Sequence, residues 1–271
     1  MGEEHRMVIP GLQERVPDVC DFVVAAARRA GLNERAIYHC QMAVDEACTN
    51  VIEHGFIVSG QASQGQIEII CRDDRDTYTI QIADNSPPFN PLLRDDPDPE
   101  TPLTEREPGG WGVYFIKKMM DMASYHYEDG RNILTLAKHK EPQNMVQPRH
   151  SQPATAIPAY ALTERIWKVS PELPRLESNT APDLQAALDA QLDAGRVWLI
   201  VDMSRVGYIS TSGLKVLVNA WRRARDSNGS VVLAGLHPHV QEVFETVGFD
   251  QIFDIFTSIE DALAHLDGQM V

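Results

Sequence analysis

A proline-rich stretch near the middle of the chain constrains the fold most. Residues 141–158, EPQNMVQPRHSQPATAIP, hold four prolines and two Gln-Pro steps, and their apolar residues follow no period. Proline removes a backbone N–H donor and fixes φ, so neither a helix nor a central strand runs easily through such a segment. The stretch predicts an interdomain linker between one domain over 1–140 and a second over 159–271. Each part is long enough to bury its own core.

The residue pattern of the first predicted domain indicates helices followed by an antiparallel sheet. Apolar residues recur at helical spacing over 18–32 and 34–55, and Gly31 and Gly55 mark the ends of these runs. Alternation of apolar and polar residues then predicts paired strands, because successive strand side chains point to opposite faces. The predicted strands cover 65–73, 77–84, 124–129 and 132–139, with a further helix over 111–122.

The second predicted domain alternates strands with helices, which favours an α/β layer. The run RVWLIVDMS at 196–204 is apolar on both faces, as expected of a buried central strand. An edge segment is predicted near 164–171 and another strand at 230–236. The predicted helices cover 180–195, 214–229, 238–248 and 258–266.

Charge and composition exclude several classes of function. The chain carries 24 Lys and Arg against 39 Asp and Glu, a net charge of −15, and both predicted domains are acidic. Nucleic-acid binding needs a surface that neutralises phosphates, so direct contact with nucleic acid is not expected. No apolar run approaches the ~18 residues that span a bilayer, so no membrane association is expected. Four cysteines without a Cys-x-x-Cys pair favour reduced, buried thiols in a cytoplasmic protein.

Three short patterns in the first domain could carry chemistry. Glu46 and Asn50 are four residues apart and share one helix face, although a solvated polar face has the same pattern. Asp84 ends a predicted strand, where a carboxylate can accept the exocyclic amine of a purine or simply form a turn. The sequence GGWG at 109–112 precedes an amphipathic helix, whose N-terminal N–H groups favour anionic oxygens; a plain turn is the alternative.

Taken in order, these patterns resemble the Bergerat-type ATP-binding fold, the GHKL family shared by gyrase, Hsp90 and histidine kinases. Over residues 10–140 the closest resemblance is to the small serine-kinase anti-sigma factors. AVDEACTNVIEHGF at 43–56 is similar to their N box, IADNSPPFNP at 82–91 to their first glycine box, and GGWGVYFIKKMMD at 109–121 to their second. The resemblance implies an α+β fold, a two-layer α/β sandwich of helices on a sheet.

The resemblance also implies a role for each residue that matches these motifs. Asn50 would hold Mg²⁺, Glu46 would be the general base for the acceptor hydroxyl, and Asp84 would bind the adenine amine. This division suits phosphoryl transfer, in which a metal screens charge and a carboxylate orients the nucleophile. Segment 91–108 takes the position of the ATP lid, and its six acidic residues and lack of a basic phosphate clamp favour a solvated lid.

Four further residues are placed at the nucleotide by the same resemblance. Gly110 and Gly112 would let the lid and the helix close on the phosphates, and Asn132, with Thr135, would lie near the carboxylate that binds the base. One departure from the wider ATPase pattern concerns nucleotide affinity. Residues 86–88 are Ser-Pro-Pro where those relatives carry Asp-x-Gly-x-Gly.

A second candidate site lies in STSG at 210–213. Ser and Thr are preferred helix N-caps, so one of these residues is expected to cap the helix that follows. A phosphate there would meet free N–H groups and add about −1.5 to −2 charges to the surface. Residues 160–270 resemble the STAS domain of anti-sigma factor antagonists, an α/β fold whose phosphoacceptor follows an acidic residue. Ser210 takes the acidic position here, so Thr211 is the candidate acceptor with Ser212 second, unless the domain only binds partners.

Together these patterns predict an ATP- and Mg²⁺-dependent serine/threonine-protein kinase of the anti-sigma type, fused to a STAS domain that is substrate, autoinhibitor or docking site. The expected setting is a cytoplasmic partner-switching circuit that regulates transcription, with a sigma factor or a STAS antagonist protein as partner. The resemblance also implies a homodimer through the kinase domain. A nonenzymatic, nucleotide-dependent scaffold is the alternative. Glu46 favours catalysis, whereas the missing acidic residue before Thr211 favours the scaffold.

Overall fold

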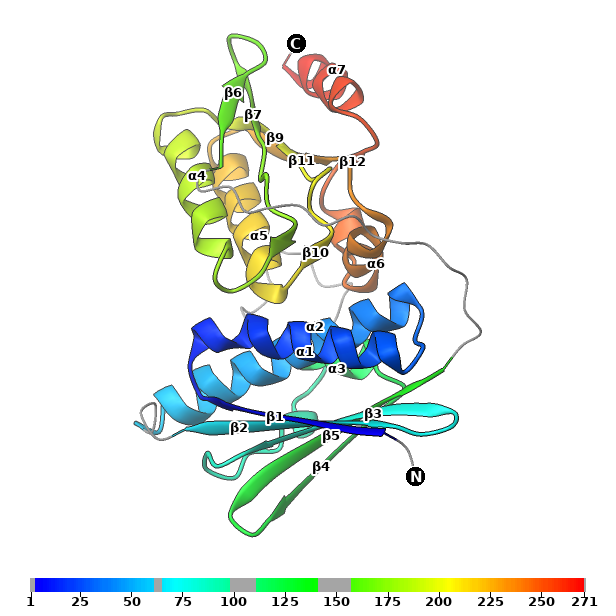
Figure 1. The fold of residues 1–271 in the computed structure, drawn as a ribbon. Coiled ribbons are helices and arrows are strands. Elements are labelled where there is room, and N and C mark those ends of the chain that lie inside the picture. Colours follow the sequence, from blue (N-terminus) through cyan, green and yellow to red (C-terminus); the bar gives the residue numbers. More distant parts are fainter. Residues whose placement is uncertain (1–2, 61–64, 98–110, 141–156, 271) are drawn as a thin grey trace. The chain divides into compact units, whose positions relative to one another are not determined.

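The computed structural model of this chain describes residues 3–60, 65–97, 111–140 and 157–270 (Figure 1). These residues form two compact units, one ending at 140 and one starting at 157. All but the last two residues of the predicted linker lie outside the described residues, so the domain boundary stays a prediction. Within the described ranges, no helix combines the length and apolarity needed to cross a membrane.

The first unit is a five-stranded antiparallel sheet with helices over one face (Figure 1). The strands follow the order β1-β2-β3-β5-β4 across the sheet. Their bounds are β1 Glu3–Pro10, β2 Gln66–Asp73, β3 Thr77–Asp84, β4 Met122–Glu128 and β5 Arg131–His139. The helices are α1 Val16–Arg29, α2 Glu34–Asn50 and α3 Trp111–Met119, with 3-10 turns at Gln13–Arg15 and Pro91–Leu93 and a π-helix, η2, at Val51–Ile57. The predicted α/β sandwich is therefore confirmed.

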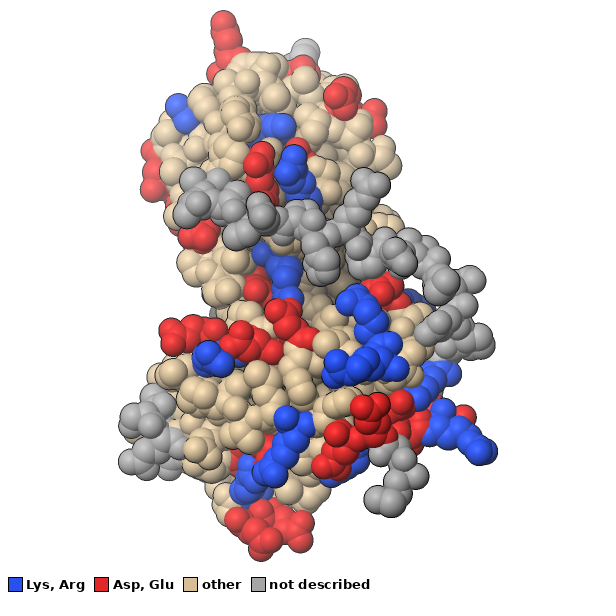
Figure 2. Space-filling view, viewed as in Figure 1, with Lys and Arg blue, Asp and Glu red and all other residues tan. Residues whose placement is uncertain are grey.

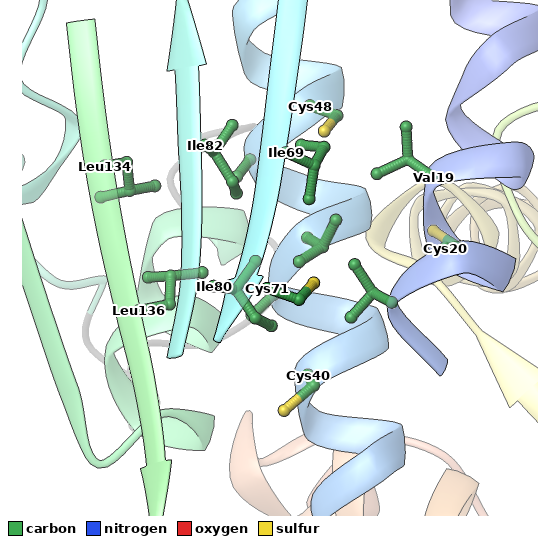
Figure 3. Close-up of a cluster of buried hydrophobic side chains, with 14 of the residues drawn as sticks. Val19, Cys20, Cys40, Cys48, Ile69, Cys71, Ile80, Ile82, Leu134 and Leu136 are labelled. Atoms are coloured by element: carbon green, nitrogen blue, oxygen red, sulfur yellow. The ribbon is translucent and has the colours of Figure 1, made fainter. Parts of the chain in front are cut away.

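The core of this unit lies between the sheet and the helices. Strand alternation sends Ile80 and Ile82 of β3 and Leu134 and Leu136 of β5 toward the helices (Figure 3). The four cysteines lie in this unit, and all four are buried thiols outside any disulfide, as predicted. Burial raises the pKa of the Cys71 thiol to about 11, and it also raises the pKa values of Cys40 and Cys48.

Two elements of the first unit differ most from the sequence prediction. Strand β1 was not predicted from the sequence. It lies at the edge of the sheet, where charged residues are common and the alternation of apolar and polar residues is weak. The helix predicted to stop at Gly55 ends as an α-helix at Asn50, and η2 then carries the chain through Gly55 to Ile57. A glycine that marks a helix end in the sequence pattern therefore lies inside a wider helical turn.

The sheet face away from the helices is held by ion pairs. Glu68 of β2 is buried and pairs with Arg6 of β1 and with Arg131 of β5, 2.7 Å away. Burial by itself would raise the pKa of Glu68, but the two guanidinium groups outweigh it and lower the pKa below its ordinary value. The Arg72 Nε of β2 donates a hydrogen bond to the Glu4 carboxylate of the edge strand β1 at 2.9 Å. On the side shown in Figure 2, basic and acidic side chains are mixed and form no continuous basic surface.

The second unit is an α/β layer, as predicted. Segment 164–171 was expected at a sheet edge, but its strand Ile166–Val169 has a paired strand on each side. Its main sheet has the order β12-β11-β9-β7-β6, parallel except for β6, and β9 lies at its centre with Leu199, Ile200 and Val201 buried. The strands are β6 Ala159–Ala161, β7 Ile166–Val169, β9 Trp198–Asp202, β11 Ser230–Ala234 and β12 Ile255–Phe256, and β8 Arg175–Leu176 pairs with β10 Tyr208–Ile209 in a separate two-stranded sheet. The helices are α4 Ala181–Asp193, α5 Thr211–Asp226, α6 Pro238–Thr246 and α7 Ile259–Gln269, with a 3-10 turn at Phe249–Gln251.

Candidate active site

Glu46 and Asn50 lie one turn apart on α2, as their spacing predicts. The Asn50 Nδ2 donates a hydrogen bond to Glu46 Oε1 at 3.3 Å. Glu46 is buried and Asn50 is partly exposed. Because the amide nitrogen is engaged with the carboxylate, the Asn50 Oδ1 is the atom available to a cation. The pair thus combines a buried carboxylate with an oxygen ligand at its side.

Gly112 brings the start of α3 against the Glu46 side chain. A Cβ placed on Gly112 would overlap the Glu46 carboxyl group, so only a residue without a side chain permits this approach. The backbone N–H groups of a helix start carry partial positive charge and favour anions. The predicted partner Gly110 lies outside the described residues.

Asp84 is the last residue of β3 and is buried. Its Oδ1 accepts hydrogen bonds from the backbone N–H of Ser86 at 2.8 Å and from Asn132 Nδ2 at 3.0 Å. Asp84 and Asn132 are direct cross-strand partners in the β3–β5 register. Antiparallel pairing therefore places the two residues side by side, although 48 positions separate them in sequence.

Asn132 also fixes the Ser-Pro-Pro turn at 86–88 that departs from the wider ATPase pattern. Besides Asp84, its Nδ2 reaches the Ser86 carbonyl at 3.0 Å, the Ser86 hydroxyl at 3.1 Å and the Pro87 carbonyl at 3.2 Å. Its Oδ1 accepts from the Phe89 N–H at 3.0 Å. A turn that lacks two N–H donors because of its prolines is in this way held by one amide of β5.

A pocket opens beside these groups, on the helix side of the sheet. Three of the predicted site residues, Asn50, Asp84 and Asn132, lie in its wall, and Glu46 adjoins it through Asn50. The rest of the wall is mostly apolar, and comprises Ala47, Val51, Gly55, Ile82, Ser86, Phe89, Pro91, Ile116, Tyr125 and Leu134. A largely apolar wall with a few convergent polar groups is typical of a site for a small organic ligand.

Thr135 is placed elsewhere. Its cross-strand partners are Gln81 of β3 and Ser124 of β4, and it is not in the pocket wall. Side chains of a strand alternate between faces, and Asn132 and Leu134 point toward the helices. Thr135 therefore lies on the opposite face of the sheet.

Several pocket residues were not singled out from the sequence as site residues. Gly55 of η2 packs on the Ser86 turn, and a Cβ at Gly55 would come within 2.7 Å of the Ser86 hydroxyl. Tyr125 of β4 enters the pocket through the β4–β5 pairing, and Phe89 follows the Pro-Pro turn with 54% of its surface exposed. A glycine inside a helical pattern was the one signal that could have indicated the first of these contacts.

Lys117 of α3 ties the start of segment 91–108 to the helix. Its Nζ donates to the Arg94 carbonyl at 2.8 Å and to the Asp96 carboxylate at 2.7 Å. The lysine is thus engaged with the chain and neutralises one of the six acidic residues of this segment.

The hydroxyl cluster of the second unit lies at the start of α5. Ser210 is the N-cap residue, and its hydroxyl accepts from the Gly213 N–H at 3.5 Å, which confirms the predicted cap. Thr211 and Ser212 are the first two residues of the helix. A Cβ on Gly213 would come within 2.9 Å of the Leu176 carbonyl, so glycine lets α5 begin close to β8.

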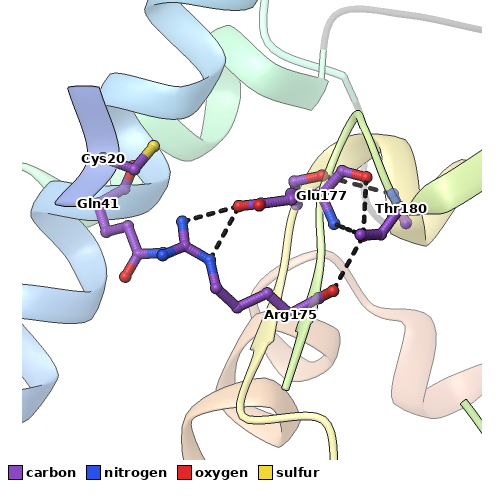
Figure 4. A network of polar contacts seen from close by, with 7 residues as sticks. Cys20, Gln41, Arg175, Glu177 and Thr180 are labelled. Carbon is purple, nitrogen blue, oxygen red and sulfur yellow. Dashed lines mark hydrogen bonds and ion pairs between the residues drawn. The ribbon is translucent and has the colours of Figure 1, made fainter. Parts of the chain in front are cut away.

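The strand that pairs with the acceptor segment is fixed by polar contacts. In Figure 4, Arg175 of β8 forms an ion pair with Glu177 at 2.7 Å, and the Thr180 hydroxyl donates to the Arg175 carbonyl at 2.9 Å. The Arg175 guanidinium also stacks on Tyr208 of β10, 5.2 Å from the ring centre. These contacts set the turn between β8 and α4, next to the strand that leads into Thr211.

Two known protein families match this chain, one in each of its two units. Residues 9–138 match the family of histidine kinase-like ATPase domains, and residues 175–262 match the STAS domain family.

Individual relatives give the same result. The second half is 42% identical over 89 residues to the anti-sigma factor antagonist BtrV of Bordetella bronchiseptica, covering 33% of this chain and 77% of BtrV. The first half is 30% identical over 118 residues to the serine/threonine-protein kinase BtrW of the same organism, covering 44% and 81%. It is 29% identical over 136 residues to the serine-protein kinase RsbW of Bacillus cereus, covering 49% and 82%. The chain therefore belongs, in its first half, to the serine/threonine-protein kinases with a histidine kinase-like ATPase domain and, in its second, to the STAS anti-sigma factor antagonists.

Proposed function

We propose that the chain transfers the γ-phosphoryl group of ATP to a serine or threonine hydroxyl of a STAS domain, in a partner-switching circuit that controls a sigma factor. The observation that carries the proposal is a pocket lined by Asn50, Asp84 and Asn132, with Glu46 beside it through its hydrogen bond to Asn50. A site that only sequesters partners has no need of a buried carboxylate at the phosphate end. Glu46 therefore favours a kinase over a scaffold.

Asp84 recognises the base in this proposal. Its Oδ1 is occupied by two N–H donors, and its Oδ2 has no hydrogen-bond donor among the described residues. A carboxylate oxygen is an acceptor only, so it suits the exocyclic amine of adenine and repels a carbonyl at the same position. The apolar wall of the pocket, including Ile82 and Leu134, suits the faces of a purine ring.

Asn50 would hold Mg²⁺. The cation prefers oxygen ligands, and it often keeps several waters while it takes one or two protein ligands and substrate phosphates. The Asn50 Oδ1 fits this demand, because Nδ2 is engaged with Glu46. When bound, the ion would neutralise charge on the transferred phosphoryl group. Gly112 brings the start of α3 next to the Glu46 carboxyl group, beside Asn50.

Glu46 would orient the acceptor hydroxyl and take its proton as the oxygen attacks the γ-phosphorus. The bond from phosphorus to the β,γ-bridging oxygen then breaks and ADP leaves. The hydrogen bond from Asn50 and the contact with α3 at Gly112 hold the carboxylate in one orientation. A positioned base of this kind contributes about 10²- to 10⁴-fold to a rate.

The fused STAS domain supplies the candidate acceptor. Thr211 follows Ser210, which takes the position of the family's acidic residue, and Ser212 comes second. A phosphate at the helix start would meet the N–H groups of the first turn and would change the charge of a docking surface. We place the linker at 141–158.

The expected partners are a sigma factor and free STAS antagonist proteins, and we place the circuit in the cytoplasm. The four cysteines, which form no disulfide in the described residues, suit a reducing compartment. A homodimer would form through the sheet face away from the helices. Support comes from two apolar side chains on its edge strands, Val8 with 52% and Met122 with 63% of their surface exposed.

The proposal is tested by incubating the full chain with γ-labelled ATP and Mg²⁺, alone and with a free STAS antagonist. We expect label on protein, and a loss of about 100-fold or more in Glu46→Gln. Glu53→Gln, which changes an exposed glutamate of η2, is the matched control and should keep the wild-type rate.

Three results would decide against this function. Label that never reaches protein, together with tight ATP binding, would indicate the nonenzymatic scaffold. Release of free phosphate without a phosphoprotein would indicate a plain ATPase. Label transfer that survives Glu46→Gln unchanged would remove the base from the mechanism.

A further inference from the structure

Tyr125 joins the hydrogen-bond network around Asp84 without any role in the mechanism above. The residue lies on β4, lines the pocket, and is partly buried. Its hydroxyl donates to Asn132 Oδ1 at 2.7 Å. Asn132 in turn bonds Asp84 at 3.0 Å. A path of two hydrogen bonds therefore links the phenol to the carboxylate that we assign to the base.

The partners of Asn132 determine which way its amide points. Two donors converge on Oδ1, the Phe89 N–H at 3.0 Å and the Tyr125 hydroxyl. Acceptors surround Nδ2, namely the Asp84 carboxylate and the Ser86 and Pro87 carbonyls. An exchange of the two amide atoms would set donor against donor and acceptor against acceptor. The hydroxyl of Tyr125 thus helps to hold Nδ2 toward Asp84.

The orientation of Asn132 decides what Asp84 offers to a ligand. With Nδ2 and the Ser86 N–H donating to its Oδ1, the carboxylate is held with Oδ2 as its acceptor for a ligand. An inverted amide would place the Asn132 Oδ1 against Asp84 Oδ1, acceptor against acceptor, and release the carboxylate from this orientation. A carboxylate held in this way accepts from an amine and repels a carbonyl.

We propose that Tyr125 is a positioning residue for base selectivity: its hydroxyl fixes the Asn132 amide so that Asp84 accepts from an exocyclic amine and rejects a carbonyl. The inference rests on the proposed function, because it requires a purine base at Asp84. The ligand class is a nucleotide whose base carries an amine at this position, as adenine does and hypoxanthine does not.

The protonation state of Tyr125 agrees with this role. Burial, with the negative charge of Asp84 adding to it, raises the pKa of the hydroxyl above its ordinary value. The phenol therefore remains a donor at neutral pH.

The test is the ratio of the affinities for ATP and ITP, measured by calorimetry on the full chain with Mg²⁺. The two nucleotides differ at the position that Asp84 contacts in the proposal. Tyr125→Phe removes the hydroxyl and keeps the ring, and should lower the ATP-to-ITP preference by about threefold to tenfold, as expected for one hydrogen bond. Tyr127→Phe removes the hydroxyl of an exposed tyrosine outside the pocket wall and should leave the ratio at the wild-type value.

The outcomes separate this inference from the proposed function. A wild-type chain without a preference for ATP would refute base recognition by Asp84, and with it the role of Tyr125. A wild-type preference that Tyr125→Phe leaves intact would refute the role of Tyr125 alone, as would an equal loss of affinity for both nucleotides. A Tyr125→Phe chain that no longer folds would also refute the role of Tyr125 in base selectivity, because the hydroxyl would then be needed for the stability of the sheet.

Discussion

At the scale of single residues, Asp84 carries the predicted base recognition through one oxygen. Its Oδ1 is engaged with Ser86 and Asn132, so Asp84→Asn can keep both bonds through the amide oxygen. The amide nitrogen would then stand where Oδ2 stands and would donate. We expect ATP affinity to fall at least about tenfold, because a bond to a charged group is lost, while ITP affinity rises. Calorimetry with both nucleotides measures this, and Asp76→Asn, in an exposed turn, should change neither affinity.

Gly112 tests the contact between α3 and the proposed base. A Cβ at this position would overlap the Glu46 carboxyl, so Gly112→Ala must displace either the helix or the carboxylate. We expect phosphoryl transfer to fall about 100-fold, since misplacement of a catalytic group is costly. Gly268→Ala on α7 meets no atom within 4 Å and is the matched control. A Gly112→Ala chain with wild-type activity would contradict the close approach.

At the scale of elements, the cap of α5 serves both stability and the acceptor site. Ser210→Ala removes the hydroxyl that accepts from Gly213 and should lower the free energy of unfolding of the second unit by about 1 kcal/mol. Ser210→Asp should keep that stability, because Asp is an equally good N-cap, and it restores the acidic residue before Thr211. Urea unfolding measures both variants. Wild-type stability in Ser210→Ala would show that the cap contributes nothing.

Glu68 lies on the sheet face away from the helices, and its ion pairs predict that the stability of the first unit depends on pH. The pKa of Glu68 is lower in the folded chain than its ordinary value, so its stabilising contribution is complete above that value and is lost as pH falls through the folded pKa. We expect Glu68→Gln to flatten the decline in stability below about pH 4.5, measured by urea unfolding from pH 3 to 6. Glu128→Gln, at the exposed end of β4, should leave the slope unchanged. A wild-type slope in Glu68→Gln would disprove the ion-pair origin.

The sequence predicts best those elements that are determined by neighbouring residues, and less well those features that arise from the pairing of distant strands. Strand β3 matches its predicted bounds because alternation and turn residues act over short distances. The role of Tyr125 was out of reach, since it arises from the register of β4 and β5 and from a turn far away in sequence. The placement of Thr135 was within reach. The alternation through Asn132 and Leu134 assigns it to the other face.

At the scale of the whole molecule, the cysteines report on the integrity of the first unit. All four thiols are buried, and burial raises the pKa of three of them, including that of Cys71 to about 11. Thiolate is the reactive form, so the folded chain should react slowly with a thiol reagent at pH 8 and unmask four thiols in denaturant. Rapid reaction of a thiol in the folded chain would contradict the packing of this core.

One chain contains both a kinase domain and a domain that is a candidate substrate of that kinase. Mass spectrometry of the full chain after incubation with ATP and Mg²⁺ tests this central claim most directly. We predict one phosphate on the peptide that contains Thr211, absent from Glu46→Gln and from Thr211→Ala. A chain that carries no phosphate at Thr211 or Ser212, and leaves an added STAS antagonist unmodified, would contradict the claim.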